Sequence, residues 1–284
     1  MSAVRLLHCS DLHFGQDVDL RQAAALAELA TALRPDAVVV AGDLTQRARH
    51  GEFQAARALL ERFAAAAPLL VVPGNHDVQW WASVLHARGT APLLDKYRRW
   101  IAPLMGGAVT PVLRVPGLVV VGTLSAHGIA TGSLTTRLRD LAVKGHLPAS
   151  ETDRAAAEFA TAPPGTARVL VLHHNVLRGR LSRRMGLARP EAAWRRLEAC
   201  GADVVLCGHD HEEAAAATPG GLPVATSSTH TSRTRGGRPS ACNVVTVEPG
   251  APRARVGIVP WAWDAVRGTF LPAGDGWWSA PSVG

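Results

Sequence analysis

The sequence predicts an α/β fold in which short buried strands alternate with amphipathic helices. Three observations favour this class: several apolar runs are too short to be helices, the stretches between them carry apolar residues on one helical face, and polar residues follow each apolar run abruptly. Such alternation is typical of a parallel sheet with helices packed on its faces. The chain has 284 residues, a length that α/β folds commonly reach as one unit, so we predict a single domain over residues 1–284.

The N-terminal part of the chain predicts the series strand, helix, strand, helix, strand. Asp19 is placed to cap the first helix, and Pro35 follows its end. The last strand of the series is too short for a helix and too apolar for a surface loop. The predicted elements are strand 6–10, helix 20–33, strand 37–41, helix 52–66 and strand 68–72.

The C-terminal part continues the alternation and ends in strands separated by Gly and Pro turns. The predicted elements are strands 112–115 and 118–123, helix 151–161, strand 168–172, helix 190–199, strand 203–207 and successive strands over 214–259. Two regions break the pattern. We expect an insertion over about residues 78–106, with a short helix at 94–104, and a C-terminal strap over about residues 260–284 that packs on the body.

The charge of the chain allows an anionic partner. The formal net charge is +7 and the isoelectric point is about 10.2. Basic surfaces that bind single-stranded nucleic acid are usually interleaved with stacking aromatics, whereas aromatics make up 5% of this sequence. Most of the positive charge is arginine spread over helices and loops, which favours a solvated surface over a nucleic-acid site. Attraction of a small phosphate-bearing substrate is compatible with this charge.

The cysteines and the apolar runs indicate the compartment. The four cysteines show no Cys-x-x-Cys spacing, and Cys9 and Cys207 fall inside predicted buried strands, so they are expected to be core thiols. No charged N-terminal segment precedes a long apolar one, and no apolar run approaches the about 20 residues that span a bilayer. We therefore predict a cytoplasmic protein without a membrane partner.

Five of the predicted strands lead into residues that can bind metals. The motifs are Asp11-x-His13, Gly42-Asp43, Gly74-Asn75-His76-Asp77, His173-His174-Asn175 and Gly208-His209-Asp210-His211. Ligands of open α/β sheets bind beyond the carboxyl ends of the strands, so these motifs are expected to converge. A single motif of this kind also fits a turn, because Gly, Asn and Asp favour turns. Five such endings, each after an apolar strand, favour a metal site.

The strand ends supply carboxylate, amide and imidazole groups in a number too large for one ion. The seven candidate ligands are Asp11, His13, Asp43, Asn75, His173, His209 and His211. A carboxylate can bridge two metals about 3.5–4 Å apart, the arrangement that stabilises the attacking and the leaving oxygen in phosphoryl displacement. Asp43 stands alone at the end of a central strand and is the predicted bridge.

The donor types restrict the identity of the metal. The lack of a thiolate ligand argues against a structural zinc site, and mixed imidazole and carboxylate ligands suit Mn, Fe, Zn, Co or Ni better than Mg or Ca alone. We expect two divalent or trivalent ions, with Mn, Fe or Zn favoured. Such cations lower the pKa of a bridging water toward neutrality, which supplies a hydroxide for attack on phosphorus.

Other polar residues of the same motifs have predicted roles beside the metals. His76 is not required as a ligand, so it is the predicted proton donor to the leaving oxygen or a group that stabilises charge on the phosphoryl oxygens. His174, Asp77 and Asp210 either orient ligands or face solvent.

Substrate contacts are expected from histidines at strand ends and from an arginine-rich loop. His127 follows a predicted strand, and the loop 178–189 leaves the site after His174. The loop carries five arginines, among them Arg178 and Arg180. Guanidinium groups bind phosphate through paired hydrogen bonds, although runs of charge are more often solvated. His127, His174, Arg178 and Arg180 are therefore candidate substrate-binding residues.

Taken together, the five motifs resemble those of the calcineurin-like metallophosphoesterase superfamily, from Val4 to about His211. The resemblance implies a four-layer α/β/β/α sandwich with a two-metal centre at the sheet edges and His76 near the leaving group. The implied ligands are Asp11, His13, Asp43 and His211 for one metal, and Asp43, Asn75, His173 and His209 for the other.

Three segments resemble a narrower branch, the bacterial class III cyclic-nucleotide phosphodiesterases. They cover residues 10–15, 42–47 and 72–78. Asn175 departs from this branch, which often has Pro after the two histidines, and the difference alters the loop that carries the arginines. The resemblance implies hydrolysis of a small phosphodiester such as a 3′,5′-cyclic nucleotide.

Other functions use a similar centre. A phosphomonoesterase or a nuclease needs the same ligands, although the additional DNA-binding segments of the superfamily's repair nucleases are not identifiable in this sequence. A non-catalytic scaffold that binds a partner protein is expected to have lost ligands, whereas all seven candidates and His76 are present. A phosphoesterase with a small substrate is therefore the favoured prediction.

Overall fold

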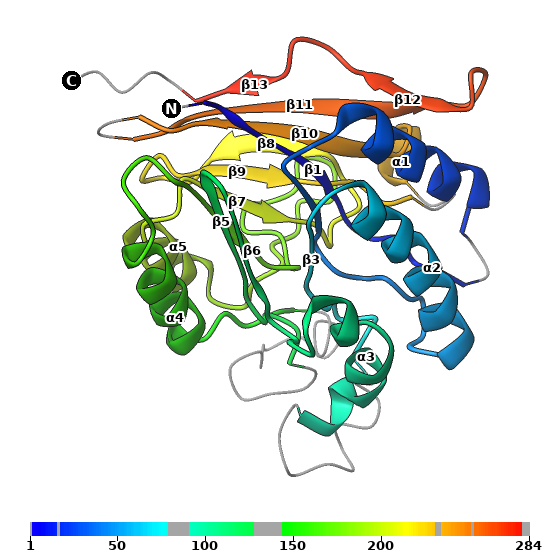
Figure 1. Cartoon of the computed structure of the whole chain (residues 1–284), viewed down its shortest axis with the longest axis horizontal. Coiled ribbons are helices and arrows are strands. Elements are labelled where there is room, and N and C mark those ends of the chain that lie inside the picture. The colour runs from blue at the N-terminus through cyan, green and yellow to red at the C-terminus, as the bar shows by residue number, and fades with distance from the viewer. Residues whose placement is uncertain are drawn as a thin grey trace.

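Two β-sheets lie face to face in the computed structural model, and helices cover the outer face of each sheet (Figure 1). The structure describes residues 2–15, 18–78, 91–127, 144–230, 234–250 and 253–279. Apolar side chains pack in three clusters, one between the sheets and one beneath each layer of helices. This is a four-layer α/β/β/α arrangement, so the predicted fold class is confirmed.

The first sheet has a parallel half and an antiparallel half. Its seven strands among the described residues are, in order, β12 (Thr269–Pro272), β11 (Arg255–Asp264), β10 (Ala241–Glu248), β1 (Val4–Cys9), β2 (Ala37–Val40) and β3 (Leu69–Val71), with β13 (Trp277–Trp278) paired to β11. The strands β1, β2 and β3 are parallel. The segments that follow these three strands therefore emerge at one edge of the sheet.

The second sheet is parallel at its centre and antiparallel at both edges. Its six strands among the described residues are, in order, β4 (Val112–Val115), β5 (Leu118–Gly122), β6 (Ala167–Val171), β7 (Val204–Cys207), β9 (Pro223–Thr226) and β8 (Ala214–Ala217). The pairs β5 with β6, β6 with β7 and β7 with β9 are parallel. The segments after β6 and β7 thus also emerge together.

Helices lie on the outer faces of the sheets (Figure 1). They are α1 (Leu20–Leu33) and α2 (His50–Ala66) on the first sheet, α4 (Ala149–Ala160) and α5 (Pro190–Ala199) on the second, and α3 (Asp95–Trp100) beside α2. Asp19 caps α1 as predicted, since its side chain accepts a hydrogen bond from the N–H of Arg21. Within the described parts of the chain, no helix combines the length and the apolar character that crossing a membrane requires.

Alternation of side chains along the strands explains the layers. In β1, Leu6 packs between the two sheets and Leu7 packs beneath α1 and α2. In β6, Val169 packs between the sheets and Leu170 packs beneath α4 and α5. Most positions on both faces of these strands are buried, which is why the strands are largely apolar, with Arg5, His8 and Arg168 as the exceptions. All four cysteines are buried and free, so the prediction of core thiols is confirmed.

The predicted insertion contains less regular helix than expected. The helix predicted over 94–104 ends at Trp100, and a 3₁₀-helix follows at Ala102–Met105. Pro103 explains the end, because proline has no N–H to donate to the carbonyl of Arg99 and its ring clashes with that carbonyl. Residues 79–90 of the insertion lie outside the described part of the chain.

The C-terminal segment, predicted as a strap, consists largely of strands. Trp261 and Trp263 belong to β11, and both β12 and β13 pair with β11 in antiparallel fashion. The guanidinium of Arg255 lies over the indole of Trp278, 4.3 Å from the ring centroid. The segment therefore extends the first sheet. Residues 280–284 lie outside the described part of the chain.

Candidate metal centre

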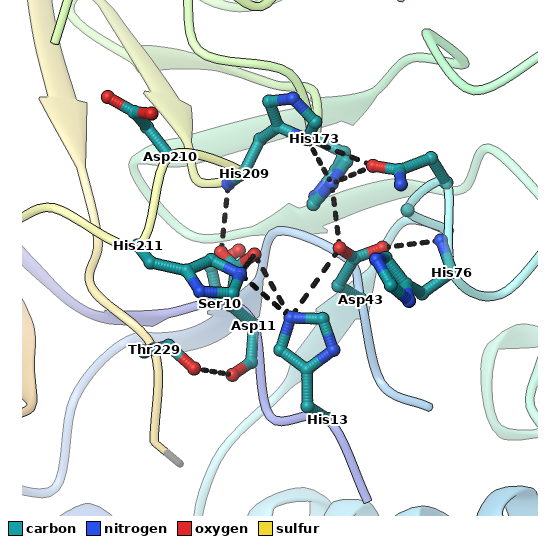
Figure 2. A network of polar contacts seen from close by, with 12 residues as sticks. Ser10, Asp11, His13, Asp43, His76, His173, His209, Asp210, His211 and Thr229 are labelled. Carbon is teal, nitrogen blue, oxygen red and sulfur yellow. Dashed lines mark hydrogen bonds and ion pairs between the residues drawn. The ribbon is translucent and has the colours of Figure 1, made fainter. Parts of the chain in front are cut away.

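Polar residues from five strand ends, three in the first sheet and two in the second, meet at one edge of the sandwich. The residues are Asp11 and His13 after β1, Asp43 after β2, Asn75 after β3, His173 after β6, and His209 and His211 after β7. Figure 2 shows the carboxylate of Asp43 between the imidazoles of His13 and His173. The fold thus brings together all seven side chains that the sequence nominates as ligands.

Five of the seven candidate ligands have a left-handed backbone conformation. The φ angles are 54° at Asp11, 45° at His13, 50° at Asp43, 74° at His209 and 56° at His211. Positive φ is uncommon outside glycine, although Asp and His adopt it more often than most residues. Such conformations cluster at functional sites, where the surrounding structure holds them. Sharp turns after β1, β2 and β7 therefore present these side chains at the same edge.

Two glycines allow the strand ends to approach one another. A Cβ atom at Gly74 would overlap the carboxylate of Asp43, and a Cβ atom at Gly208 would overlap the side chains of Ser10 and Asp11. A larger residue at either position would push the loops apart. The glycines that precede Asn75 and His209 are therefore explained by close packing around the two carboxylates.

The candidate ligand atoms form two groups that share one carboxylate. Within each group the nitrogen and oxygen atoms lie within 4.8 Å of one another. The first group contains Asp11, His13, Asp43 and His211, and the second contains Asp43, His173 and His209. Oδ1 of Asn75 joins the second group, 3.0 Å from Nε2 of His173 and 2.9 Å from Nδ1 of His209. This is the division that the resemblance implies for two metals.

Asp43 lies between the two groups. Its Oδ1 accepts a hydrogen bond from the backbone N–H of His76 at 2.8 Å, which fixes the orientation of the carboxylate. Its Oδ2 lies 3.3 Å from Nε2 of His173 and 3.7 Å from Nε2 of His13. One oxygen thus faces an imidazole of each group, the position that a bridging carboxylate occupies.

In the first group, the two carboxylate oxygens of Asp11 also have separate contacts. Its Oδ2 accepts a hydrogen bond of 2.9 Å from the N–H of His209. Its Oδ1 is buried and receives no hydrogen bond from any described residue, yet it lies 3.3 Å from Nε2 of His211. Beside it, Nε2 of His13 and Nε2 of His211 face each other at 2.9 Å. Two ring nitrogens and an unpaired carboxylate oxygen aimed at one point fit a metal cation.

The tautomer of His173 also suits a ligand. Its Nδ1 lies 2.8 Å from the backbone carbonyl of Ala41. A carbonyl only accepts, so Nδ1 carries the proton and Nε2 points into the second group. Metal-binding histidines usually donate their other ring N–H in this way, which orients the ring and raises its basicity.

The carboxylates and imidazoles perturb one another strongly. Burial raises the pKa of Asp11, but its interactions with His13, His211 and His173 together outweigh burial and hold the pKa well below its usual value. Burial also raises the pKa of Asp43, but His173, His76 and His13 together outweigh burial and lower it. Burial lowers the pKa of His173, but its interactions with Asp43 and Asp11 and its hydrogen bond to the carbonyl of Ala41 together raise the pKa to about 9. Both carboxylates are therefore ionised at neutral pH, and they attract positive charge to the centre.

His76 lies beside the first group without belonging to it. Its Nδ1 lies 2.8 Å from the carbonyl oxygen of Gln46, so Nδ1 donates and Nε2 is left for another partner. Its ring meets the ring of His13 edge-on, with centroids 4.8 Å apart. The side chain is partly exposed, unlike those of most candidate ligands. This position suits a proton donor to the leaving oxygen, a role that stays a prediction.

Asp77 is buried and holds two strand ends together, so the alternative in which it faces solvent is wrong. It accepts hydrogen bonds from the N–H groups of Gly74, Leu44 and Thr45 and from the hydroxyl of Thr45. Burial and then the charge of Asp43 raise its pKa to about 6, against the opposing effect of these N–H groups. Asp77 therefore fixes the turns that carry Asp43 and Asn75.

His174 is also buried and lies against the ligands. Its Nδ1 is 2.9 Å from Oγ of Ser125, and its ring lies 5.0 Å from that of His173 and 4.5 Å from that of His209. The alternative in which it faces solvent is therefore wrong as well. These contacts favour an orienting role over direct binding of a substrate.

The other candidate substrate residues lie outside the two ligand groups. His127 is mostly buried, its Nε2 is 3.1 Å from the carbonyl of Leu124, and burial lowers its pKa. Arg178 and Arg180 are exposed, and Arg178 donates to the carbonyl of Arg183 at 2.8 Å. Their contacts with a substrate stay predictions.

Several residues that support the site carry no signal in the sequence. The hydroxyl of Thr229 donates to the carbonyl of Asp11 at 2.8 Å, although the two residues are 218 positions apart. The hydroxyl of Ser10 donates to the carbonyl of Ala41 at 2.9 Å. Ser10 is next to Asp11 in the chain, so only its neighbour hints at a role. Thr229 and Ser125 become visible as supports only in the folded molecule.

Comparison with known proteins found two phosphodiesterases with similar sequences. The chain is 31% identical over 300 residues to a cAMP/cGMP dual specificity phosphodiesterase of Mycobacterium tuberculosis, covering 95% of this chain and 83% of that protein. A glycerophosphodiester phosphodiesterase of Enterobacter lignolyticus is 42% identical over 82 residues, 25% of this chain and 29% of that protein.

Two solved structures share the fold. A dimetal phosphatase from Danio rerio has a TM-score of 0.58 at 14% identity and covers 95% of this chain and 98% of its own. A purple acid phosphatase of yellow lupin has a TM-score of 0.62 at 9% identity and covers 95% of this chain and 53% of its own. The model of the calcineurin-like phosphoesterase family matches residues 4–213. The chain therefore belongs to the calcineurin-like phosphoesterase family of metal-dependent hydrolases.

Proposed function

We propose that this chain is a two-metal phosphodiesterase that hydrolyses small phosphodiesters, with 3′,5′-cyclic nucleotides as the favoured substrates. The observation that carries the proposal is the pair of ligand groups that share Asp43. The similarity to a cAMP/cGMP phosphodiesterase over 95% of the chain supports the choice of substrate. The shorter similarity to a glycerophosphodiester phosphodiesterase supports a diester over a monoester.

Asp43 would be shared by two cations held by the two groups, and Mn, Fe or Zn suit these donors best. When bound, such cations lower the pKa of a coordinated water and neutralise phosphoryl charge, which supplies a nucleophile for phosphorus at neutral pH. The protein holds the metal-binding side chains in fixed orientations. The backbone N–H groups of His76 and His209 fix the carboxylates of Asp43 and Asp11, and the carbonyl of Ala41 fixes His173.

His76 would protonate the leaving oxygen. The carbonyl of Gln46 holds its Nδ1–H, which directs Nε2 away from that carbonyl. Its partial exposure leaves room for a substrate to reach it. General acids at such positions commonly contribute about 10²- to 10⁴-fold to the rate.

The remaining roles follow from position. Arg178 and Arg180 are exposed on the loop that follows His174, where their positive charge would attract a phosphate ester. His127 is a candidate substrate contact. His174 would orient the candidate ligand His209, because their ring centroids lie 4.5 Å apart. The buried, free cysteines fit the predicted cytoplasmic location, in which thiols stay reduced.

The test is a comparison of four substrates with the protein freed of metal by a chelator and reloaded with Mn²⁺. The substrates are 3′,5′-cyclic AMP, 2′,3′-cyclic AMP, bis-p-nitrophenyl phosphate and p-nitrophenyl phosphate. We expect kcat/KM to be highest for the 3′,5′-cyclic nucleotide and to fall to background in the chelated protein.

Each other outcome changes the proposal in a defined way. If only the synthetic diester is cleaved, the two-metal centre stands and another phosphodiester is the substrate. If the monoester is cleaved best, the chain is a phosphomonoesterase. If Mn²⁺ binds and no ester is cleaved, the hydrolase proposal fails and the chain acts as a binding protein.

A further inference from the structure

The residue between two candidate ligands points away from the metal centre. Asp210 lies between His209 and His211 and is only 2% exposed. Figure 2 shows its carboxylate turned away from Asp11 and Asp43, and it belongs to neither ligand group. A buried carboxylate that binds no metal needs other partners, because an unpaired buried charge is strongly unfavourable.

Asp210 finds its partners in two other loops. Its Oδ2 accepts a hydrogen bond of 2.5 Å from the hydroxyl of Ser182, in the arginine-rich loop. Its Oδ1 lies 3.5 Å from Nε of Arg235, and the same Nε donates to the backbone carbonyl of Asp210. Asp210 belongs to the ligand loop, residues 208–211, which carries His209 and His211. One residue of this loop thus joins residues 28 and 25 positions away.

A second carboxylate holds the same part of the arginine-rich loop. Glu212 is 3% exposed, and both of its oxygens lie 3.0 Å from the N–H of Leu181. The N–H of Ser182 lies 3.4 Å from Oε2 of Glu212. A Cβ atom at Gly179 would overlap the carboxylate of Asp210, so this backbone passes directly over it. The loop is therefore docked on the ligand loop even though its arginine side chains are exposed.

The ligand loop needs such a restraint. The φ angles of 74° at His209 and 56° at His211 place both ligands in the left-handed region, which persists only where surrounding contacts hold it. The N–H of His209 is held by Asp11, but the imidazole of His211 is a quarter exposed. Asp210 lies between these two residues, and its contacts with Ser182 and Arg235 hold this part of the loop in place.

We propose that Asp210 is a positioning residue that fastens the ligand loop to Ser182 and Arg235, so that His209 and His211 stay aimed at the metals and the arginine-rich loop stays docked beside them. The inference rests on the proposed metal centre, which it extends to a residue outside the ligand set. The contacts of Asp210 would then have two linked effects. They would raise the affinity for metal, and they would fix the position of residues 178–184.

The test measures both effects on the full-length protein. Mn²⁺ binding to the chelated protein is followed by titration calorimetry for the wild type, Asp210→Ala, Asp210→Asn and Ser182→Ala. Removal of a group that orients ligands commonly weakens metal binding about 10- to 100-fold, which we expect for Asp210→Ala. Asp210→Asn keeps an acceptor for Ser182 and loses the charge opposite Arg235, so a smaller loss is expected.

Limited digestion with trypsin supplies a readout that needs no metal. Arg178, Arg180, Arg183 and Arg184 are exposed and offer cleavage sites within the docked loop. In Asp210→Ala and Ser182→Ala this loop should be cut several-fold faster than in the wild type, with the fragments identified by mass. Asp264→Asn is the matched control, since it alters a carboxylate paired with Arg267 in an exposed turn and leaves every cleavage site in place.

The outcomes separate this inference from the proposed function. If the wild type binds no Mn²⁺, the metal centre itself fails. If the wild type binds Mn²⁺ and both Asp210→Ala and Ser182→Ala keep its affinity and its digestion rate, the positioning role is overturned and the centre stands. If Asp210→Ala does not fold, as judged by circular dichroism, Ser182→Ala and Asp210→Asn decide, because each removes only one part of the contact.

Discussion

The two ligand groups share Asp43 but differ in their other charges. The first group contains a second carboxylate, Asp11, whereas the second receives an uncharged amide oxygen from Asn75. The attraction for a cation grows with the negative charge of its ligands. One shared carboxylate therefore does not make two equal sites, and we expect the first group to bind its metal more tightly than the second.

The buried residues near the two carboxylates also differ in charge. Near Asp11, His8 is fully buried, and burial lowers its pKa to about 3, so it is neutral at physiological pH. Near Asp43, Asp77 is a buried carboxyl group that accepts four hydrogen bonds. A neutral residue thus lies near Asp11, and an acidic one holds the turn that carries the shared Asp43.

The largest effect is expected for Asp43→Asn, which removes the feature that both groups have in common. The substitution takes a negative charge from both metals at once. We expect loss of both Mn²⁺ ions and a fall in kcat/KM beyond the about 100-fold that marks removal of a supporting residue. Metal content after dialysis and turnover of the preferred diester measure the two effects. Full activity with two bound ions would show that Asp43 is not shared.

A smaller and more selective effect is expected when the charge difference between the groups is changed. Asp11→Asn takes one carboxylate from the first group. The Mn²⁺ affinity of the tighter binding step should therefore fall toward that of the weaker step. Asn75→Asp adds a carboxylate to the second group and should strengthen the weaker step. Calorimetric titration resolves both steps. If both variants leave them unchanged, charge does not distinguish the groups.

An effect on stability is expected for Asp77→Asn. The amide keeps one oxygen, but its NH₂ group must face N–H donors of Gly74, Leu44 or Thr45, which already surround this side chain. Each buried donor left without an acceptor costs about 1–3 kcal/mol. Urea unfolding should show a loss of this size, and the exposed Asp95→Asn should show almost none. Unchanged stability would mean that the turns after β2 and β3 do not depend on this carboxylate.

The smallest effect is a pH dependence associated with His8. In the folded chain burial lowers the pKa of His8 to about 3, from 6.5. The unfolded chain therefore binds a proton below pH 6.5 that the folded chain excludes. The stability that neutral His8 contributes is complete above pH 6.5 and is lost as the pH falls toward 3.

His8→Gln isolates this contribution, because glutamine does not titrate. Relative to the variant, the wild type should lose at most about 1.4 kcal/mol of its free energy of unfolding for each pH unit below 6.5. Urea unfolding of the metal-free proteins at pH 7.5, 6.5 and 5.5 tests this. Parallel curves for the two proteins would contradict the neutral state of His8.

Much of the fold could be predicted from local pattern. The strands after which Asp11, Asp43 and His173 occur are largely apolar, and the helices between them place apolar residues on one face, so both are visible in short windows of sequence. The C-terminal segment shows the limit of this reasoning. Trp277 and Trp278 form a strand because they pair with β11, and no local periodicity in the sequence predicts that pairing.

The types of candidate ligand and their order along the chain were determined by the sequence alone, because each one directly follows a strand that its own composition reveals. The grouping around Asp43, the orientation of Asp210 and the contacts of Ser182, Arg235 and Thr229 were decided by the tertiary structure. These contacts join loops that are 25 to 218 positions apart. Their geometry depends on how two sheets pack face to face, which no stretch of sequence encodes by itself.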